Sequence, residues 1–314
     1  MIAPMALGVF AGDAHRLSLQ SSFPKMAELE REYGSLIRAL LTRKRRRSTA
    51  GGMSGLHSFR EGMQALPRAL AARGGIHVRC HAAVRGLVRS ATGWQVVVSG
   101  AVEPLQADAV VVATEPGVSA ALLREHDAGL AAALDGIYCP PVAVVALGFD
   151  PAAGARIPPG FGVLIARGAG FRMLGNLWDS HLFAGRNPGG HMLIRAMYGG
   201  GVDPDAAQLA ADDLTALARS EVSRLYGLDS APQFEHVTRW PHAIPQYELG
   251  HAVRVRQIEA RVAALPGIFL TGAGLRGVAF PQAAADGVRI GEAAVAWLAG
   301  ESGRNARPEW PASP

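Results

Sequence analysis

The chain has 314 residues, of which 49% are apolar and 18% are charged, and its formal net charge is +5. This length suffices for a large core and for about two domains. No stretch reaches the roughly 18 uncharged apolar residues of a membrane span, and the N-terminus lacks the regions of a signal peptide. The composition therefore predicts a mixed α and β protein of the cytoplasm.

The charged residues and cysteines narrow the range of partners. No aromatic residues interleave with the basic run at 43–47, so we favour a solvated loop or helix end over a nucleic-acid contact. A weak peripheral contact with the inner face of the membrane stays open as the alternative. Cys80 and Cys139 lie outside any C-x-x-C motif, which predicts two buried thiols in a reducing compartment. The ten histidines lack metal-ligand spacing, so we predict no metal site.

The N-terminal part of the chain alternates between predicted turns and helices. Residues 8–13 are punctuated by glycines, which predicts a turn or a close backbone approach. Residues 24–41 begin with Pro24 and carry apolar residues along one face, which predicts one helix. The glycines of 51–55 predict a flexible break, and a second helical stretch follows through Ala72.

A dense series of predicted strands follows. Residues 76–80, 83–88 and 94–98 are short β-branched runs separated by turn residues. Residues 109–113 are continuously apolar, which is typical of a parallel strand buried on both faces, and a helix to Leu123 follows.

From residue 139 the pattern changes to a second, largely antiparallel sheet. Five runs predict its strands: 140–148, 161–165, 175–178, 191–197 and 233–240. Long helices are predicted over 205–226 and 251–264.

Residues 272–277 spell G-x-G-x-x-G, the dinucleotide-binding fingerprint. The motif follows an apolar run at 267–271 that predicts a strand, and it precedes an Ala-rich helix over 283–298. In this context glycines let backbone N–H groups approach a pyrophosphate at a helix N-terminus. A Rossmann unit then requires a further strand with an acidic residue about 20 positions on, and none follows here. The motif therefore closes a nucleotide site whose opening half lies elsewhere, or it is an accident of a glycine-rich chain.

Several segments stand in a characteristic order and spacing: 8–13 with 17–19 and 23–24, then 34–37, 62–67, 161–164 with 174–180, 244–251 and 272–279. Together they resemble the protoporphyrinogen oxidase family, FAD enzymes of haem biosynthesis in the amine-oxidase and phytoene-desaturase superfamily. Singly they are weak, whereas their shared order and spacing make the resemblance specific.

The resemblance implies an α/β fold: a Rossmann-like FAD-binding domain with an inserted, mostly antiparallel substrate-binding domain. Residues 48–138 and 246–303 would form the split FAD domain, and 139–245 the substrate domain. Residues 1–47 would be a helical segment of the substrate side, and 304–314 a tail. The family's first strand and phosphate loop have no match before Gly8, so we expect a truncated Rossmann domain that binds FAD weakly or not at all.

The resemblance further implies oxidation of protoporphyrinogen IX to protoporphyrin IX, with noncovalent FAD and with oxygen as the acceptor. Because the flavin supplies the redox chemistry, we predict no indispensable catalytic side chain. Coproporphyrinogen III as substrate and another flavin amine oxidase or desaturase stay open, as does, in a different class, an inactive remnant without cofactor. We expect no nucleic-acid partner, and a homodimer stays open.

Individual positions carry these roles by resemblance. Those expected to contact FAD are Val84 at the adenine, Trp240 near the isoalloxazine ring, Gly272 and Gly277 in the motif, and Val278, Ala279 and Phe280 at the flavin end. Gly8, Leu164 and Trp178 are expected to line the tetrapyrrole site, where an apolar substrate needs close backbone approach and apolar walls. Gln282 and Asp286 depart from the family's pattern, which predicts altered hydrogen bonding near the flavin.

Overall fold

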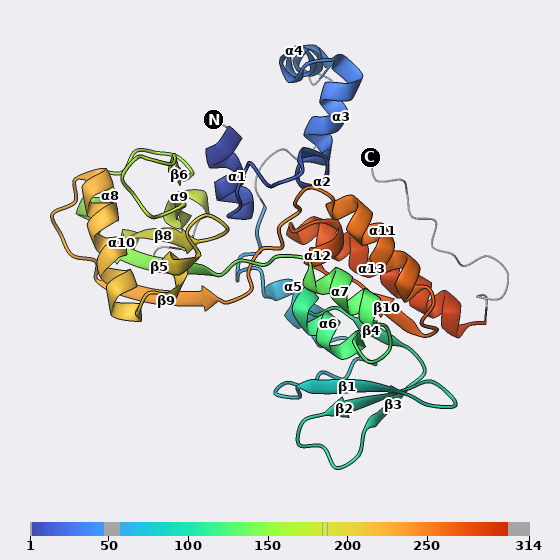
Figure 1. Ribbon diagram of the computed structural model, residues 1–314. Helices are drawn as coiled ribbons and strands as arrows, with labels where there is room; N and C mark the ends of the chain where they lie inside the picture. Colours follow the sequence, from blue (N-terminus) through green and yellow to red (C-terminus); the bar gives the residue numbers. More distant parts are fainter. Residues whose placement is uncertain (1, 47–56, 184, 187, 301–314) are drawn as a thin grey trace. The chain divides into compact units, whose positions relative to one another are not determined.

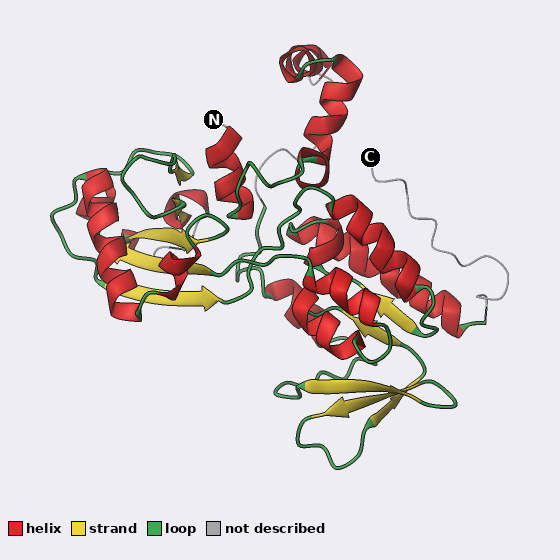
Figure 2. Ribbon diagram, in the orientation of Figure 1, coloured by secondary structure: helices red, strands yellow, loops and turns green. Residues whose placement is uncertain are grey.

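The computed structural model describes residues 2–46, 57–183, 185–186 and 188–300 (Figure 1). The chain divides into two compact units. We call Met1–Leu17 with Cys139–Gln246 the sheet unit, and Ser18–Tyr138 with Tyr247–Pro314 the turn unit. Both contain helices and strands, so the predicted α/β class is confirmed (Figure 2). The expected segment 1–47 is divided between the units after Leu17.

The sheet unit is built on a five-stranded antiparallel sheet. In spatial order the strands are β6 (Gly162–Leu164), β7 (Gly175–Trp178), β8 (Met192–Gly199), β5 (Val142–Phe149) and β9 (Phe234–Trp240). Each predicted strand of this region is present, because alternating apolar runs between glycine-rich turns are a strong strand signal.

Short helices and one long helix complete this unit. They are α1 (Ile2–Phe10), α8 (Pro151–Gly154), α9 (Asp179–Leu182), η2 (Pro188–Gly190), η3 (Pro204–Gln208) and α10 (Ala211–Tyr226). The helix predicted over 205–226 is interrupted because Leu209 and Ala210 are extended. Of the two alternatives predicted for 8–13, Gly8 shows the close approach, to Leu164, and lies inside α1. The helix ends at Phe10, and the following residue, Ala11, has a left-handed φ of 50°.

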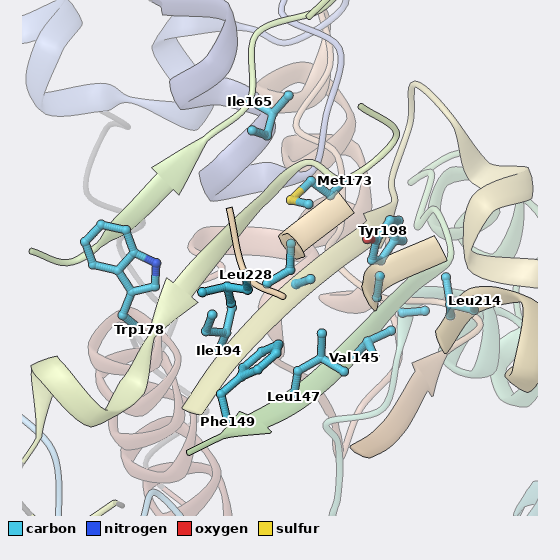
Figure 3. Packing of buried hydrophobic residues seen from close by; sticks show 14 of the residues in the cluster. Val145, Leu147, Phe149, Ile165, Met173, Trp178, Ile194, Tyr198, Leu214 and Leu228 are labelled. Atoms are coloured by element: carbon cyan, nitrogen blue, oxygen red, sulfur yellow. The ribbon is translucent and has the colours of Figure 1, made fainter. Parts of the chain in front are cut away.

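One face of the sheet carries the core of the unit (Figure 3). Val145 and Leu147 of β5 and Ile194 of β8 alternate onto this face and pack with Leu214 and Val222 of α10. Because side chains alternate along a strand, the intervening residues must point to the other face.

The turn unit combines two small sheets with helices. Its elements are α2 (Leu19–Ser22), α3 (Pro24–Tyr33), α4 (Leu36–Arg46), α5 (Ala65–Ala71), β1 (Val84–Arg89), β2 (Trp94–Val98), β3 (Leu105–Ala107), β4 (Val110–Val112), α6 (Pro116–Leu123), α7 (Ala128–Asp135), α11 (His251–Val262), β10 (Ile268–Leu270), α12 (Ala273–Arg276) and α13 (Phe280–Leu298). Strands β1, β2 and β3 form an antiparallel sheet, whereas β4 and β10 pair in parallel. The predicted strand–motif–helix order at β10, α12 and α13 is confirmed.

Several local predictions for the turn unit are wrong. The helix over 24–41 is two helices, because Gly34 adopts a left-handed conformation with φ 70°. Residues 76–80 are exposed and form no strand with any described residue, since a β-branched run still needs a partner strand. Val111 in β4 is exposed, so that strand is not buried on both faces.

Other predictions concern the surface of the chain. Cys80 is exposed and Cys139 is half-buried, so the predicted burial of both thiols is wrong. The basic run begins within α4, which ends at Arg46, and Arg47 and the break at 51–55 lie outside the described residues. Among the helices that the structure describes, none combines the length and the apolar character needed to cross a membrane.

Candidate active site

The G-x-G-x-x-G motif forms a tight turn between β10 and α13, which we call the glycine turn (residues 272–277). Gly272 and Gly277 have φ values of 130° and 127°, where a side chain would strain the backbone. A Cβ on Gly274 would lie 2.5 Å from Cγ of Pro116, at the start of α6. All three glycines are therefore required by the local backbone or by its packing.

Tyr247 holds the glycine turn through its hydroxyl group. The Tyr247 hydroxyl accepts the Gly277 N–H at 2.6 Å and donates to the Ala273 carbonyl at 2.5 Å. The tyrosine is buried, and its ring stacks on His251 with centroids 4.0 Å apart. Both ends of the turn are thus fixed by one side chain from the segment before α11.

His251 supports the same turn. Its Nε2 lies 3.3 Å from the Leu275 carbonyl. Burial lowers the pKa of His251 from 6.5 to about 4, so the ring is neutral near pH 7 and its Nε2–H donates to that carbonyl. The Leu275 N–H in turn bonds the Gly272 carbonyl. Because protein groups satisfy these backbone atoms, the turn differs from a phosphate loop whose N–H groups face a ligand.

A buried polar cluster braces the turn against α11 and α13. The Thr271 hydroxyl donates to Asp286 at 2.5 Å, and Arg276 pairs with both Glu259 and Asp286. Arg289 also donates to Asp286. Burial raises the pKa of Asp286, but hydrogen bonds from Thr271 and Arg289 and the charge of Arg276 lower it by more. The pKa therefore lies below its usual value, and the carboxylate stays ionised. Asp286 therefore organises the interior of the turn unit.

The start of α13 is the exposed part of this region. Ala279 is the N-cap and makes no side-chain capping bond, and Ala279 and Phe280 are exposed while Val278 is half-buried. A helix of 19 residues begins here, so its N-terminal N–H groups carry a partial positive charge. The structure thus brings together Gly277, Val278, Ala279 and Phe280. Val84, by contrast, starts β1 in the three-stranded sheet, opposite Val98.

The second region is the face of the five-stranded sheet opposite α10, which we call the open sheet face. Its residues follow from the strand register: Gly162, Leu177, Arg195, Ala146 and His236 form one cross-strand row, and Leu164, Gly175, Met197, Val144 and Thr238 form the next, flanked by Val142 with Trp240 and by Leu193, Gly148 and Phe234. Most of these residues are apolar or glycine. Leu164, Phe234 and Trp240 are exposed, and most of the others are half-buried. The face is therefore a largely apolar floor.

Helix α1 covers one end of this floor. Leu7 and Ala11 pack with Val142 and Met197. A Cβ on Gly8 would lie 2.2 Å from Cδ2 of Leu164, so α1 approaches β6 this closely only because residue 8 is glycine. The predicted substrate residues Gly8 and Leu164 are therefore neighbours.

Two hydrogen bonds fix the C-terminal end of α1. The buried side chain of Gln246 donates to the Phe10 carbonyl at 2.8 Å, and the Gly201 N–H donates to the Ala11 carbonyl at 2.7 Å. Gln246 belongs to the matching segment 244–251, which begins with I-P-Q-Y. Gln246 thus anchors α1 in the sheet unit. The residue after it, Tyr247, anchors the glycine turn in the turn unit.

Trp178 does not share the face of Gly8 and Leu164. It pairs with Ile194 on the α10 side and is 4% exposed (Figure 3). Its indole N–H lies 2.9 Å from both Asn176 Oδ1 and Tyr226 Oη, so its polar atom is satisfied inside the core. The preceding residue, Leu177, faces the open side instead, because neighbouring strand residues point to opposite faces.

Trp240 is on the open sheet face, at the end of edge strand β9. The structure therefore groups it with Leu164 in the sheet unit, whereas residues 272–280 belong to the turn unit.

Three further residues were not singled out from the sequence. Tyr247 stood within the I-P-Q-Y segment, but its partners are more than 20 residues away along the chain. His251 ended the same segment without any spacing that marks a role. Arg195 had a visible signal, since it is the one charge in the apolar run of β8.

Residues 1–294 match the family of flavin-containing amine oxidoreductases. The chain belongs to this family. Membership implies FAD as the cofactor. A coproporphyrinogen III oxidase of Bacillus subtilis is 29% identical, with 94% of this chain and 63% of the relative covered. The chloroplastic protoporphyrinogen oxidase 1 of Spinacia oleracea is 30% identical, with 89% and 54% covered. The chain thus spans between about half and two thirds of the lengths of these relatives.

Solved structures with a similar fold are also found. A "Putative protoporphyrinogen oxidase" from Exiguobacterium sp. 255-15 superposes with a TM-score of 0.80 at 22% identity, covering 94% of this chain and 63% of that one. A reduced UDP-galactopyranose mutase superposes with a TM-score of 0.63 at 12% identity, covering 98% and 66%. At these identities the likeness concerns the fold alone.

Proposed function

We propose that this protein is a flavin-dependent porphyrinogen oxidase that converts protoporphyrinogen IX to protoporphyrin IX with oxygen as the acceptor. The observation that carries the proposal is the open sheet face, a largely apolar floor in a chain of a flavin family. A large apolar macrocycle needs such a surface, because several small and aliphatic side chains can contact it together. The names of the relatives support the same substrate class.

The turn unit has a region that fits an electron-rich part of FAD. The first N–H groups of α13 lack a side-chain cap, and the residues around them are at least partly exposed. We propose that Val278, Ala279 and Phe280 contact the flavin end, that Gly272 and Gly277 shape the turn that delivers them, and that Val84 contacts the adenine. Trp240 is proposed to lie near the flavin ring. Bound FAD would supply the redox chemistry, and the protein would position the substrate and exclude water.

We propose no side chain as an indispensable acid or base. The open sheet face offers His236, Thr238 and Arg195 as its polar groups, and Arg195 is already paired with Asp179. Gly8 and Leu164 are proposed to contact the macrocycle where α1 meets β6. Because Trp178 lies in the core, Leu177 is proposed to contact the macrocycle in its place.

Coproporphyrinogen III is the second candidate substrate. The observation that favours it is the 29% identity to the coproporphyrinogen III oxidase of Bacillus subtilis over 94% of this chain. The two substrates share the macrocycle and differ in their carboxylate groups, so the same floor suits both. If neither porphyrinogen is oxidised, the alternatives are an amine oxidase or desaturase activity, or a remnant without cofactor.

The test is oxidation of each porphyrinogen by the purified chain at increasing FAD concentration. We expect porphyrin fluorescence to rise faster than spontaneous oxidation, with FAD dependence and with oxygen uptake. No FAD-dependent rise with either substrate would contradict the proposal.

Substitutions at two exposed leucines test where the substrate binds. Leu164 is on the open sheet face, whereas Leu249 is in the turn unit, and both are exposed. Leu164→Glu places a carboxylate on the apolar floor, where we expect it to raise KM about tenfold. Leu249→Glu is the control and should leave KM unchanged. Equal effects would mean that the open sheet face does not bind the substrate.

Three expectations about assembly remain proposals with simple tests. Size-exclusion chromatography with light scattering separates a homodimer from a monomer. Sedimentation with anionic vesicles tests the peripheral membrane contact. Cell fractionation tests the cytoplasmic location.

A further inference from the structure

Arg195 is the one lysine or arginine among the residues that form the open sheet face. Its neighbours in the cross-strand row are Leu177 and Ala146, and its side chain is 43% exposed. A cation on an apolar floor is costly unless it has a partner or a function there.

Part of the guanidinium group is already committed. Nε and Nη2 of Arg195 donate to the two carboxylate oxygens of Asp179, with Nη2 at 2.7 Å from Oδ1. The Asp179 side chain is 12% exposed, at the start of α9. A two-point bond of this kind fixes the plane of the guanidinium group and therefore its direction.

The remaining nitrogen is available. Nη1 carries two N–H donors, and it bonds no other group in the part of the chain that the structure describes. Because Asp179 occupies the Nε–Nη2 edge, those donors project from a guanidinium group already held in place. Their fitting partner is an acceptor with negative charge, and a carboxylate gives the strongest hydrogen bond of this kind.

We propose that Arg195 binds a carboxylate group of the macrocyclic substrate on the open sheet face, with Asp179 as the positioning residue. This inference rests on the proposed function, which supplies an apolar ring that carries carboxylates. With the carboxylate at Arg195, the ring would extend over the next row, which includes Met197, Val144 and Thr238, towards α1. The apolar floor would contact the ring, and Arg195 would set its orientation.

A second bidentate pair in the same unit gives a matched control. Arg219 donates through Nε and Nη2 to the two carboxylate oxygens of Glu235. Glu235 pairs with Leu147, so it lies on the α10 side of the sheet. Arg219→Gln therefore removes the same charge and the same type of ion pair from the opposite face.

The experiment measures binding of protoporphyrin IX and of its dimethyl ester to the purified chain, in one buffer with one detergent. We expect the wild-type protein to bind the acid about tenfold more tightly than the ester, the usual effect of one charge-assisted hydrogen bond. Arg195→Gln should lose that preference while still binding the ester. Arg195→Lys should keep part of the preference, and Arg219→Gln should keep all of it. Circular dichroism of each variant checks the fold.

The possible failures are distinguishable. If the wild-type protein binds neither compound, the proposed function fails. If it binds both but Arg195→Gln keeps the preference for the acid, the function stands and the assignment of Arg195 is wrong. If Arg195→Gln weakens the acid and the ester equally, Arg195 has only a structural role, and the assignment is again wrong.

Discussion

The glycine turn and the open sheet face differ in how their polar groups are satisfied. In the turn, Tyr247 and His251 satisfy backbone atoms from inside the protein, and the glycines are required by conformation and packing. On the open sheet face, apolar side chains are half-exposed and Arg195 keeps donors available. The most recognisable motif of this sequence therefore shapes the backbone, whereas the surface suited to an apolar ligand is assembled by the register of several strands.

The largest expected effect separates the two faces of the sheet. Trp178→Ala should lower the free energy of unfolding by about 4 kcal/mol, because it removes a buried aromatic side chain from the core. Trp240→Ala, on the open face, should cost about 1 kcal/mol, since Trp240 is 46% exposed. Urea denaturation measures both. Similar costs for the two substitutions would remove the distinction between a covered and an open face.

The second prediction tests how the turn is held. The folded-state pKa of His251, about 4, lies below its unfolded value of 6.5, so the unfolded chain binds the extra proton. Its contribution to stability is therefore full above pH 6.5 and is lost as the pH falls through 4, by about 3 kcal/mol in all. His251→Gln keeps a donor for the Leu275 carbonyl but does not titrate. The slope of its unfolding free energy against pH should be smaller than that of the wild-type protein, by the equivalent of about one bound proton. Identical slopes for the two proteins would contradict the role of His251.

The third prediction concerns the hydroxyl group of Tyr247. Tyr247→Phe leaves the Gly277 N–H and the Ala273 carbonyl without that partner, and should lower the free energy of unfolding by about 2 kcal/mol. It should also weaken FAD binding, because the turn leads directly into α13. Tyr33→Phe is the control, since the Tyr33 hydroxyl bonds no group among the described residues. An unchanged FAD affinity would separate the turn from the cofactor site.

The smallest effect is expected where α1 meets the open sheet face. Gly8→Ala places a Cβ 2.2 Å from Leu164 Cδ2, and should cost about 1 kcal/mol despite the better helix propensity of alanine. In a Leu164→Ala background the same change should become neutral or stabilising. Thermal denaturation of the four proteins gives the coupling energy, and strictly additive effects would mean that the two residues do not constrain each other.

Sequence patterns predicted the elements well where they were long or strictly alternating. The strands of the sheet unit and the order of β10, α12 and α13 are present as predicted. Predictions failed where the local structure depends on residues that are distant in the sequence. Residues 76–80 have strand propensity but no pairing strand among the described residues.

The candidate site was predictable only in part, because a single residue step changes the face of a strand. Leu164 and Trp178 both stood in matching segments, yet the register places Trp178 in the core and Leu177 on the open side. The hydroxyl of Tyr247 bonds groups beyond α11, which no local pattern encodes.

The central claim is that the open sheet face binds the macrocycle. Its most direct test is a crystal structure of the protein with protoporphyrin IX. The account predicts that the ring lies over Leu164, Met197 and Val144, with one carboxylate within hydrogen-bonding distance of Arg195. A ring bound away from this face, with Arg195 contacting only Asp179, would contradict the account.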